Sequence, residues 1–248
     1  MQRLILGAEA LGLRLTPGQV GAFQVYLEDL VAWNQKFNLT AITDPEQIEI
    51  RHFLDSLSVL QAEETHQVLS SPGARAIDIG SGAGFPGIPL AIIYPQAQMT
   101  LLEATGKKVA FLGHIAQRLR LEGVTAMHGR AEDVGHDPAH REQYGLALAR
   151  AVAELPVVVE YALPLCRGGG YLVAQRGSDG RAEAQAAQRA IGLLGGELQR
   201  AVTVRVPGLP EGPTLVVIRK ASPTPGGYPR RAGMPSKRPL GGEPSAPT

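Results

Sequence analysis

Strand-like and helical segments alternate through the middle of this 248-residue chain, and no other feature of the sequence constrains the fold as strongly. Strands that are separated by helices pair in parallel, and the helices pack on the two faces of the sheet. The alternation therefore predicts a doubly wound α/β fold. The predicted strands cover residues 74–79, 99–103, 124–128, 146–150 and 171–175, and the predicted helices cover residues 88–94, 109–119, 156–165 and 182–194.

The last part of this pattern departs from strict alternation. Two strand-like segments, 201–206 and 214–219, are separated only by the Pro- and Gly-rich residues 207–213. A parallel connection needs a dozen or more residues, so these two strands are predicted to be antiparallel. A doubly wound sheet with an antiparallel last strand resembles class I, Rossmann-like methyltransferases that use S-adenosylmethionine (SAM). This resemblance concerns the fold and does not by itself establish an activity.

The first part of the chain has the pattern of helices. Residues 16–19 combine a cap residue, a proline and a glutamine in a capping-box arrangement, and residues 44–47 repeat the start signal. Residues 33–40, between these helices, are predicted to form a turn because Asn and Thr favour turns. The chain is thus predicted to consist of an N-terminal helical extension (1–70), a SAM-binding methyltransferase domain (71–221) and a basic tail (222–248).

Charge is distributed unevenly, although the net charge is only +1. Residues 1–75 carry five basic and nine acidic side chains, whereas residues 219–248 carry six basic and one acidic. The overall balance excludes an acidic disordered chain and a uniformly basic nucleic-acid coat. The single cysteine, Cys166, excludes a disulfide framework and a zinc site built from cysteine pairs. Without a membrane-length apolar run or a secretory signal, the protein is expected to be soluble and cytoplasmic.

A glycine-rich loop, 78–87, follows the first predicted strand. Glycines let the backbone approach a ligand closely, and doubly wound sheets bind ligands at the carboxyl ends of their strands. Residues 82–87 also match the dinucleotide fingerprint G-x-G-x-x-G, so an NAD-linked oxidoreductase is an alternative. Two features favour SAM. Asp78 stands two residues before Gly80, as in the acidic loop of SAM enzymes, and no second domain is left to form a nicotinamide half-site.

Side chains at the ends of the following strands extend the predicted site. Glu103 ends the second strand, where a carboxylate can accept hydrogen bonds from both ribose hydroxyls of an adenosine ligand. Residues 130–133 follow the third strand, and their backbone and carboxylates can contact the edge of an adenine. Arg150 ends the fourth strand, the position that faces the transferable methyl group in such folds. A pair between Arg150 and Glu154 is an equally open alternative.

Two motifs that the chain lacks exclude two kinds of methyl acceptor. The fourth strand does not carry the Asp/Asn-Pro-Pro-Tyr/Phe motif of enzymes that methylate exocyclic amines, and the paired cysteines of cytosine-C5 methylases are missing. Guanine N7 is a methyl acceptor that needs neither motif, because it has a lone pair and no proton. In-line attack on the methyl group then requires alignment and no general base. We therefore predict no catalytic acid–base residue and no metal ligand.

Several stretches also match a known family. The chain resembles, over about 22–240, the bacterial small-subunit ribosomal RNA guanine-N7 methyltransferases, also called glucose-inhibited division protein B. The resemblance implies SAM-dependent methylation of one guanine N7 in 16S rRNA, with the rRNA or the small ribosomal subunit as partner and no obligatory protein partner. The matching stretches are 33–42, 51–57, 78–91, 102–103, 107–112, 130–132, 149–151, 228–233 and 235–240.

The same match implies positions for the SAM contacts. One departure is Gln175, where many relatives have lysine. His52, Asp55 and Ser56 lie three to four residues apart on one helix face, where they could contact RNA or the open side of SAM. The predicted SAM contacts are Gly80, Gly82, Phe85, Glu103, Ala104, Thr105, Ala131, Glu132 and Arg150.

The tail is unlike the rest of the chain. It holds seven Pro and five Gly in 27 residues, a composition typical of segments without packed structure. Its cations and Tyr228 suit loop RNA, and a disordered solubilising end is an equal alternative. Deletion after Ala221 is predicted to weaken RNA binding and leave SAM affinity intact. A non-catalytic SAM-binding ribosome-biogenesis factor stays open as a third function. The predicted RNA contacts are Arg230, Arg231, Lys237 and Arg238.

Overall fold

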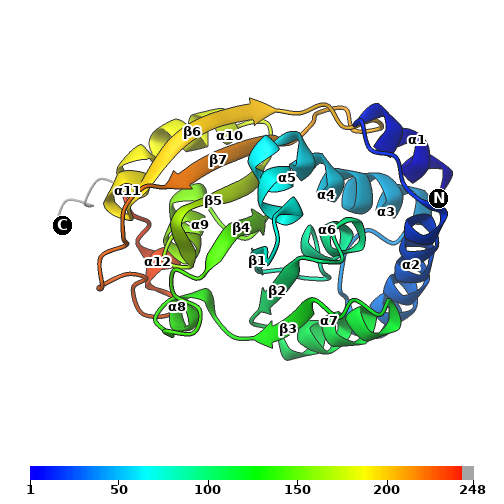
Figure 1. Cartoon of the computed structure of the whole chain (residues 1–248), viewed down its shortest axis with the longest axis horizontal. Helices are drawn as coiled ribbons and strands as arrows, with labels where there is room; N and C mark the ends of the chain where they lie inside the picture. Colours follow the sequence, from blue (N-terminus) through cyan, green and yellow to red (C-terminus); the bar gives the residue numbers. More distant parts are fainter. Residues whose placement is uncertain (242–248) are drawn as a thin grey trace.

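A seven-stranded sheet with helices on both faces forms the centre of the computed structural model, which describes residues 1–241 (Figure 1). The strand order is β3-β2-β1-β4-β5-β7-β6. Strands β1 to β5 are parallel, and β7 is antiparallel to both of its neighbours. This confirms the predicted doubly wound sheet with an antiparallel last strand. The strands are β1 (Arg75–Ile79), β2 (Gln98–Glu103), β3 (Val124–His128), β4 (Tyr144–Arg150), β5 (Cys166–Arg176), β6 (Gly196–Thr203) and β7 (Thr214–Lys220).

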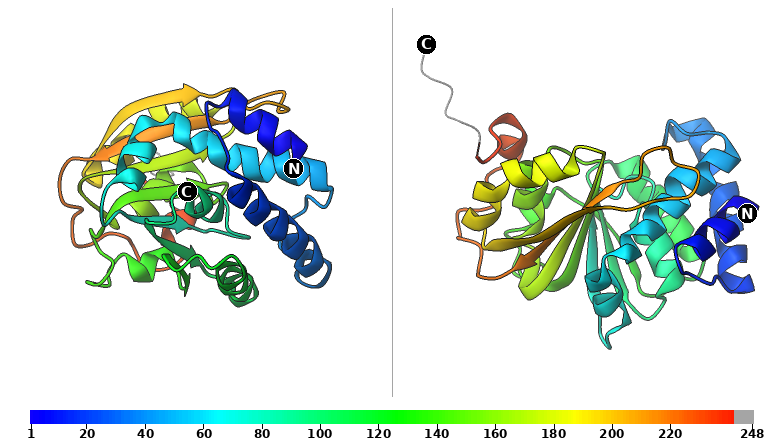
Figure 2. Two further views of the ribbon diagram at one scale, coloured as in Figure 1. Left: turned by 45° about the vertical axis from the view of Figure 1, so that its right-hand side comes forward. Right: turned by 90° about the horizontal axis from the view of Figure 1, so that it is seen from above.

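The helices form an N-terminal group and a group that alternates with the strands. Figure 2 shows the first two helices, in blue, at one end of the molecule, away from α11 (yellow) and α12 (red). Within residues 1–241, no helix has both the length and the apolar character needed to cross a membrane. The N-terminal group is α1 (Gln2–Ala10), α2 (Pro17–Phe37), α3 (Pro45–Ile48), the π-helix η1 (Glu49–Leu54), α4 (Asp55–Leu57), the 3₁₀ helix η2 (Ser58–Gln61) and α5 (Glu63–Ser70). The second group is α6 (Gly87–Ile93), α7 (Gly106–Arg118), α8 (Ala131–Val134), α9 (Leu155–Ala162), α10 (Gly180–Ala186), α11 (Gln188–Leu193) and α12 (Met234–Lys237).

Each face of the sheet is covered by its own hydrophobic core, because neighbouring residues of a strand point to opposite faces. In β1, Ala76 packs in the core that includes Phe23 and Phe53 from the N-terminal helices. Ile77 packs in the other core, which includes Val158 of α9. The N-terminal helices therefore bury their apolar side chains on the same sheet that carries the glycine loop.

Both predicted helix starts in the N-terminal region are confirmed. The Thr16 hydroxyl accepts from the Gln19 amide at 3.2 Å and the Gln19 side chain accepts from the Thr16 amide at 2.9 Å, which completes the capping box. The predicted turn over 33–40 is partly wrong, because α2 continues to Phe37. The helix ends where Asn38 adopts a left-handed conformation, with φ of 48°.

Other boundaries differ from the sequence-based expectation. The helix α1 was not predicted, and the predicted helix over 182–194 is divided into α10 and α11 at Ala187. The strand β6 begins at Gly196, five residues before the predicted start, and β5 begins at Cys166. These shifts leave the predicted order of strands and helices unchanged.

The expectation that the tail lacks packed structure is wrong for residues 222–241, while residues 242–248 lie outside the described part. Thr224 is buried, and its hydroxyl donates to the Leu194 carbonyl at 2.8 Å. Arg141 donates to the carbonyl oxygens of Thr224 and Tyr228, both at 2.8 Å. The tail then crosses the molecule beside α8 and α9 and forms α12 (Figure 1). We call residues 222–241 the C-terminal strap.

Candidate functional site

The glycine loop connects β1 to α6 and requires glycine for its shape. Gly80, Gly82 and Gly84 have φ of 66°, 60° and 102°, a region that residues with a Cβ atom rarely adopt. A Cβ atom at Gly84 would also lie 2.7 Å from the Tyr26 hydroxyl oxygen. That hydroxyl donates to the Ala83 carbonyl at 2.5 Å, so a helix of the N-terminal region fixes the loop.

Asp78 fixes the far end of the same loop. Its Oδ2 accepts from the Gly87 amide at 2.9 Å, and its Oδ1 is buried without a hydrogen-bond partner. Burial raises the pKa of this carboxyl to about 7, against the lowering effects of the Gly87 amide and of Arg150. The acidic residue before the first glycine therefore holds the loop, as its position in the motif indicated.

Glu103 links the loops that follow β1 and β2. Its Oε2 accepts from the Gly82 amide at 3.0 Å, and its Oε1 accepts from the Thr105 amide at 2.8 Å. The side chain is buried at the carboxyl end of β2. Each oxygen keeps a further lone pair, so the carboxylate can still accept from a diol while it holds both backbone segments.

A cavity lies at the carboxyl ends of β1 to β3 and contains four of the predicted SAM contacts: Gly80, Ala104, Ala131 and Glu132. Its walls include the apolar side chains of Ile79, Leu102 and Val152, together with Tyr161. The cavity has a volume of about 130 Å³, and its apolar walls, with buried carboxylates at the same strand ends, are a lining of the kind that suits the adenosine part of SAM. The other five predicted contacts do not line this cavity: Gly82, Phe85, Glu103, Thr105 and Arg150.

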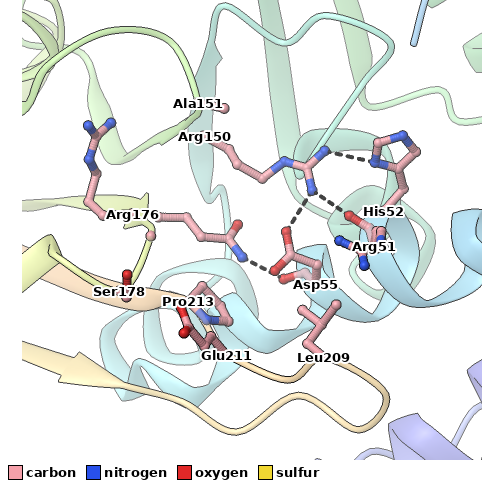
Figure 3. Close-up of a pocket in the computed structure, with 13 residues that line it drawn as sticks. Arg51, His52, Asp55, Arg150, Ala151, Arg176, Ser178, Leu209, Glu211 and Pro213 are labelled. Atoms are coloured by element: carbon pink, nitrogen blue, oxygen red, sulfur yellow. Dashed lines mark hydrogen bonds and ion pairs between the residues drawn. The ribbon is translucent and has the colours of Figure 1, made fainter. Parts of the chain in front are cut away.

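Phe85 and Arg150 belong instead to a cluster with the N-terminal helices. The His52 ring stacks on Phe85 with centroids 4.4 Å apart, and the Arg150 guanidinium lies 5.1 Å from the centre of the same ring. Arg150 donates to Asp55 Oδ2 at 2.7 Å and to His52 Nδ1 at 3.2 Å (Figure 3). The partner of Arg150 is thus Asp55, 95 residues away in the chain, and not Glu154.

Burial and the Arg150 charge together lower the pKa of His52 to about 4, so its ring is neutral at neutral pH. Because Nδ1 accepts from Arg150, the proton is on Nε2, which lies 2.8 Å from the Thr40 hydroxyl. Burial also raises the pKa of Asp55, although Arg150 opposes this effect. His52 and Asp55 therefore hold Arg150 in one position. Ser56, predicted to share their role, is buried and donates to the His52 carbonyl.

Three members of this cluster, His52, Asp55 and Arg150, line a second, larger pocket of about 550 Å³ at the ends of β4 and β5. In Figure 3, Arg150 and Arg51 lie on one side of the pocket and Glu211 and Pro213 on the other. Ala151, which follows Arg150, has φ of 53°, a strained conformation for a residue with a side chain. Arg51, Ser178, Leu209 and Glu211 were not predicted, and only the 51–57 motif gave a signal for any of them.

Gln175 lies at the floor of this pocket. Its Nε2 donates to the Asp55 carbonyl at 2.8 Å, and its buried Oε1 has no hydrogen-bond partner. The amide therefore supports the helix that carries Asp55, a contact that needs no positive charge.

The four predicted RNA contacts of the tail have different environments in the structure. Arg230 forms an ion pair with the buried Glu160. Its Nη2 donates to Oε2 at 2.6 Å, and its Nε donates to Oε1 at 2.9 Å. Arg231, Lys237 and Arg238 are exposed. The tail thus offers three cations to solvent near α12.

The fold and the glycine loop together define a class I SAM-dependent methyltransferase. Solved structures show the same fold at low identity. A putative sarcosine dimethylglycine methyltransferase from Galdieria sulphuraria matches with a TM-score of 0.54 and 12% identity, over 72% of this chain and 88% of that chain. TrmN from Thermus thermophilus matches with a TM-score of 0.51 and 18% identity, over 69% and 53% of the two chains.

Sequence comparison identifies the family. Residues 19–207 match the family model GidB, described as rRNA small subunit methyltransferase G. Ribosomal RNA small subunit methyltransferase G from Roseiflexus castenholzii is 50% identical over 97% of this chain and 100% of its own length. The protein of the same name from Chloroflexus aggregans is 50% identical over 96% and 97%. The chain therefore belongs to the rRNA small subunit methyltransferase G family, which supports SAM, and not NAD, as the ligand of the glycine loop.

Proposed function

We propose that this protein transfers a methyl group from SAM to N7 of a guanine in 16S rRNA. Family membership supports the substrate, and the arrangement of two pockets at one edge of the sheet supports the reaction. The cavity at β1 to β3 suits the donor, and the 550 Å³ pocket at β4 and β5 is large enough for one nucleotide. The observation that carries the proposal is Arg150, which ends β4 and lines the acceptor pocket beside the glycine-loop residue Phe85.

The buried groups beside Arg150 suit a reaction that needs no general base. SAM, when bound, supplies a methyl group that is electrophilic because its sulfur is a cation. Guanine N7 presents a lone pair and releases no proton on attack. Asp55 is paired with Arg150, and His52 has both ring nitrogens engaged. These side chains therefore act by fixing geometry, and alignment of this kind is worth up to about 7–11 kcal/mol.

The acceptor pocket also has a means of holding the nucleic-acid backbone. Arg51 is exposed at its rim, and its Nε donates to Gln47 at 2.8 Å, which leaves the other guanidinium donors available. Arginine binds phosphate with paired donors and positions a strand without reading its sequence. We assign Arg51 to this role, together with the exposed tail cations.

Transfer of label from SAM tests the proposal. The protein is incubated with labelled SAM and either unmodified small subunits or free 16S rRNA, and the modified base is then mapped. We expect label on one guanine N7 in at least one of the two substrates. If SAM binds but neither substrate is labelled, the non-catalytic biogenesis factor is the better interpretation.

A further inference from the structure

The C-terminal strap reaches the cavity that we assign to the adenosine of SAM. Two side chains that line this cavity, Glu132 and Tyr161, also contact the strap. Glu132 Oε1 accepts from the Gly233 amide at 2.9 Å, and the Tyr161 hydroxyl lies 3.1 Å from the Ser236 hydroxyl. The strap therefore forms the second layer behind one wall of the cavity.

The strap is fixed in this position by a buried ion pair. Glu160 has no exposed surface, and its two oxygens accept from the Arg230 side chain while Oε1 also accepts from the Arg230 amide at 2.8 Å. Arg230 Nη2 donates in addition to the Arg238 carbonyl at 2.8 Å, which holds the end of α12. A paired carboxylate and guanidinium of this kind fix both distance and orientation.

Close packing leaves little freedom between the strap and α8. A Cβ atom at Gly135 would lie 2.7 Å from the Pro229 ring, and His136 Nε2 lies 2.6 Å from the Pro229 carbonyl. Gly233, which donates to Glu132, has φ of 79° and so depends on glycine to present its amide. Since α8 has only four residues, its own hydrogen bonds give Glu132 little support.

We infer that the C-terminal strap positions Glu132 and Tyr161 for SAM and that Arg230 is a positioning residue for cofactor binding. This inference rests on the proposed cofactor site. From its composition, the tail was expected to bind RNA and to have no effect on the affinity for SAM, and this inference reverses that expectation. Arg231, Lys237 and Arg238 keep the RNA role, because their side chains are exposed.

Neighbouring arginines provide a matched pair of variants. Arg230→Gln removes the partner of Glu160, whereas Arg231→Gln removes the same charge from an exposed position. In calorimetric titrations with SAM, we expect Arg230→Gln to raise the Kd about tenfold or more and Arg231→Gln to leave it within twofold of wild type. Labelling of small subunits by Arg231→Gln should show a raised KM for the RNA substrate. An unchanged Kd for SAM in folded Arg230→Gln would overturn the inference.

A second variant separates positioning from folding. Arg230→Gln leaves the Glu160 carboxylate buried without a counter-charge, which destabilises proteins strongly. In Arg230→Gln/Glu160→Gln no unpaired charge is buried, so the fold is retained while the charged pair is lost. We expect the same rise in the Kd for SAM in this double variant. A folded double variant with the wild-type Kd would contradict a positioning role.

Hydrogen exchange tests the inference in the unmodified chain. Coupling between two sites is reciprocal, so a strap that stabilises the SAM site must itself be stabilised by SAM. We expect SAM to slow exchange at the amides of residues 231–238 as well as in the glycine loop. Slowing confined to the loop would overturn the inference. A wild-type chain that bound no SAM would instead refute the proposed function, so the two failures are distinguishable.

Discussion

Replacement of Glu103 by glutamine is expected to raise the Kd for SAM about 10- to 100-fold. The two carboxylate oxygens accept from the Gly82 amide at 3.0 Å and the Thr105 amide at 2.8 Å. Glutamine offers only one acceptor oxygen, so one amide and one ribose hydroxyl would face an NH₂ group. A hydrogen bond to a charged group is worth about 1.5–3 kcal/mol, and 1.4 kcal/mol changes an affinity tenfold. Loss of one such bond to SAM gives the stated range.

Calorimetric titration of SAM into wild type and variant measures this effect. Glu122→Gln is the matched control, because Glu122 is exposed and lies at the other end of the sheet. This substitution is expected to leave the Kd for SAM unchanged. Thermal melting without SAM shows whether Glu103→Gln is folded. A folded variant that binds SAM within twofold of wild type would refute the assignment of Glu103 to the cofactor.

Three further substitutions test other parts of the site. Because the pKa of Asp78 is raised to about 7, the native chain retains a proton that the unfolded chain loses near pH 4, and the free energy of unfolding falls as the pH rises from about 4 to 7. Asp78→Asn should abolish this fall in the free energy of unfolding, which is on the order of 3 kcal/mol. Urea titrations of wild type and variant at pH 4 and pH 7 measure the effect, and a variant with the wild-type pH dependence would contradict the reasoning. Gly84→Ala should destabilise the fold by about 1–3 kcal/mol, because φ is 102° and the new Cβ would displace Tyr26. A melting temperature equal to wild type would argue against this. Arg150→Lys should lower kcat/KM for small subunits about tenfold or more, since lysine cannot contact Asp55 and His52 together; label transfer at the wild-type rate would exclude the role.

The architecture of the sheet could be predicted because it depends on patterns that repeat over many residues. The alternation of segments and the seven-residue connection at 207–213 were sufficient for the parallel sheet and its antiparallel end. Boundaries were less predictable where a single backbone conformation decides them. The end of α2 depends on Asn38 in the left-handed region, and nothing in the apolar pattern reports that conformation.

The positions of residues at the proposed donor side follow from local sequence, whereas the pairing at the proposed acceptor side does not. Gly80 follows β1 directly and Glu103 is the last residue of β2, so their place at the sheet edge is a consequence of the strand assignment. The Arg150–Asp55 pair joins residues 95 positions apart, which no local pattern reveals. The strap was missed for a similar reason. Its composition is that of a flexible segment, but it is held by the pair between Arg230 and the buried Glu160, which only the folded chain brings together.

The position of β7 between β5 and β6 has a consequence for biosynthesis. A ribosome completes residues 166–176 and 196–203 before it reaches residues 214–220, which hydrogen-bond to both. Until that segment emerges, the nascent chain exposes one edge of β5, and β6 has no neighbour in the sheet. Unpaired strand edges are templates for aggregation. A fragment that ends before Thr214 therefore leaves this edge of β5 open to pairing with another chain, and the synthesis of β7 closes it.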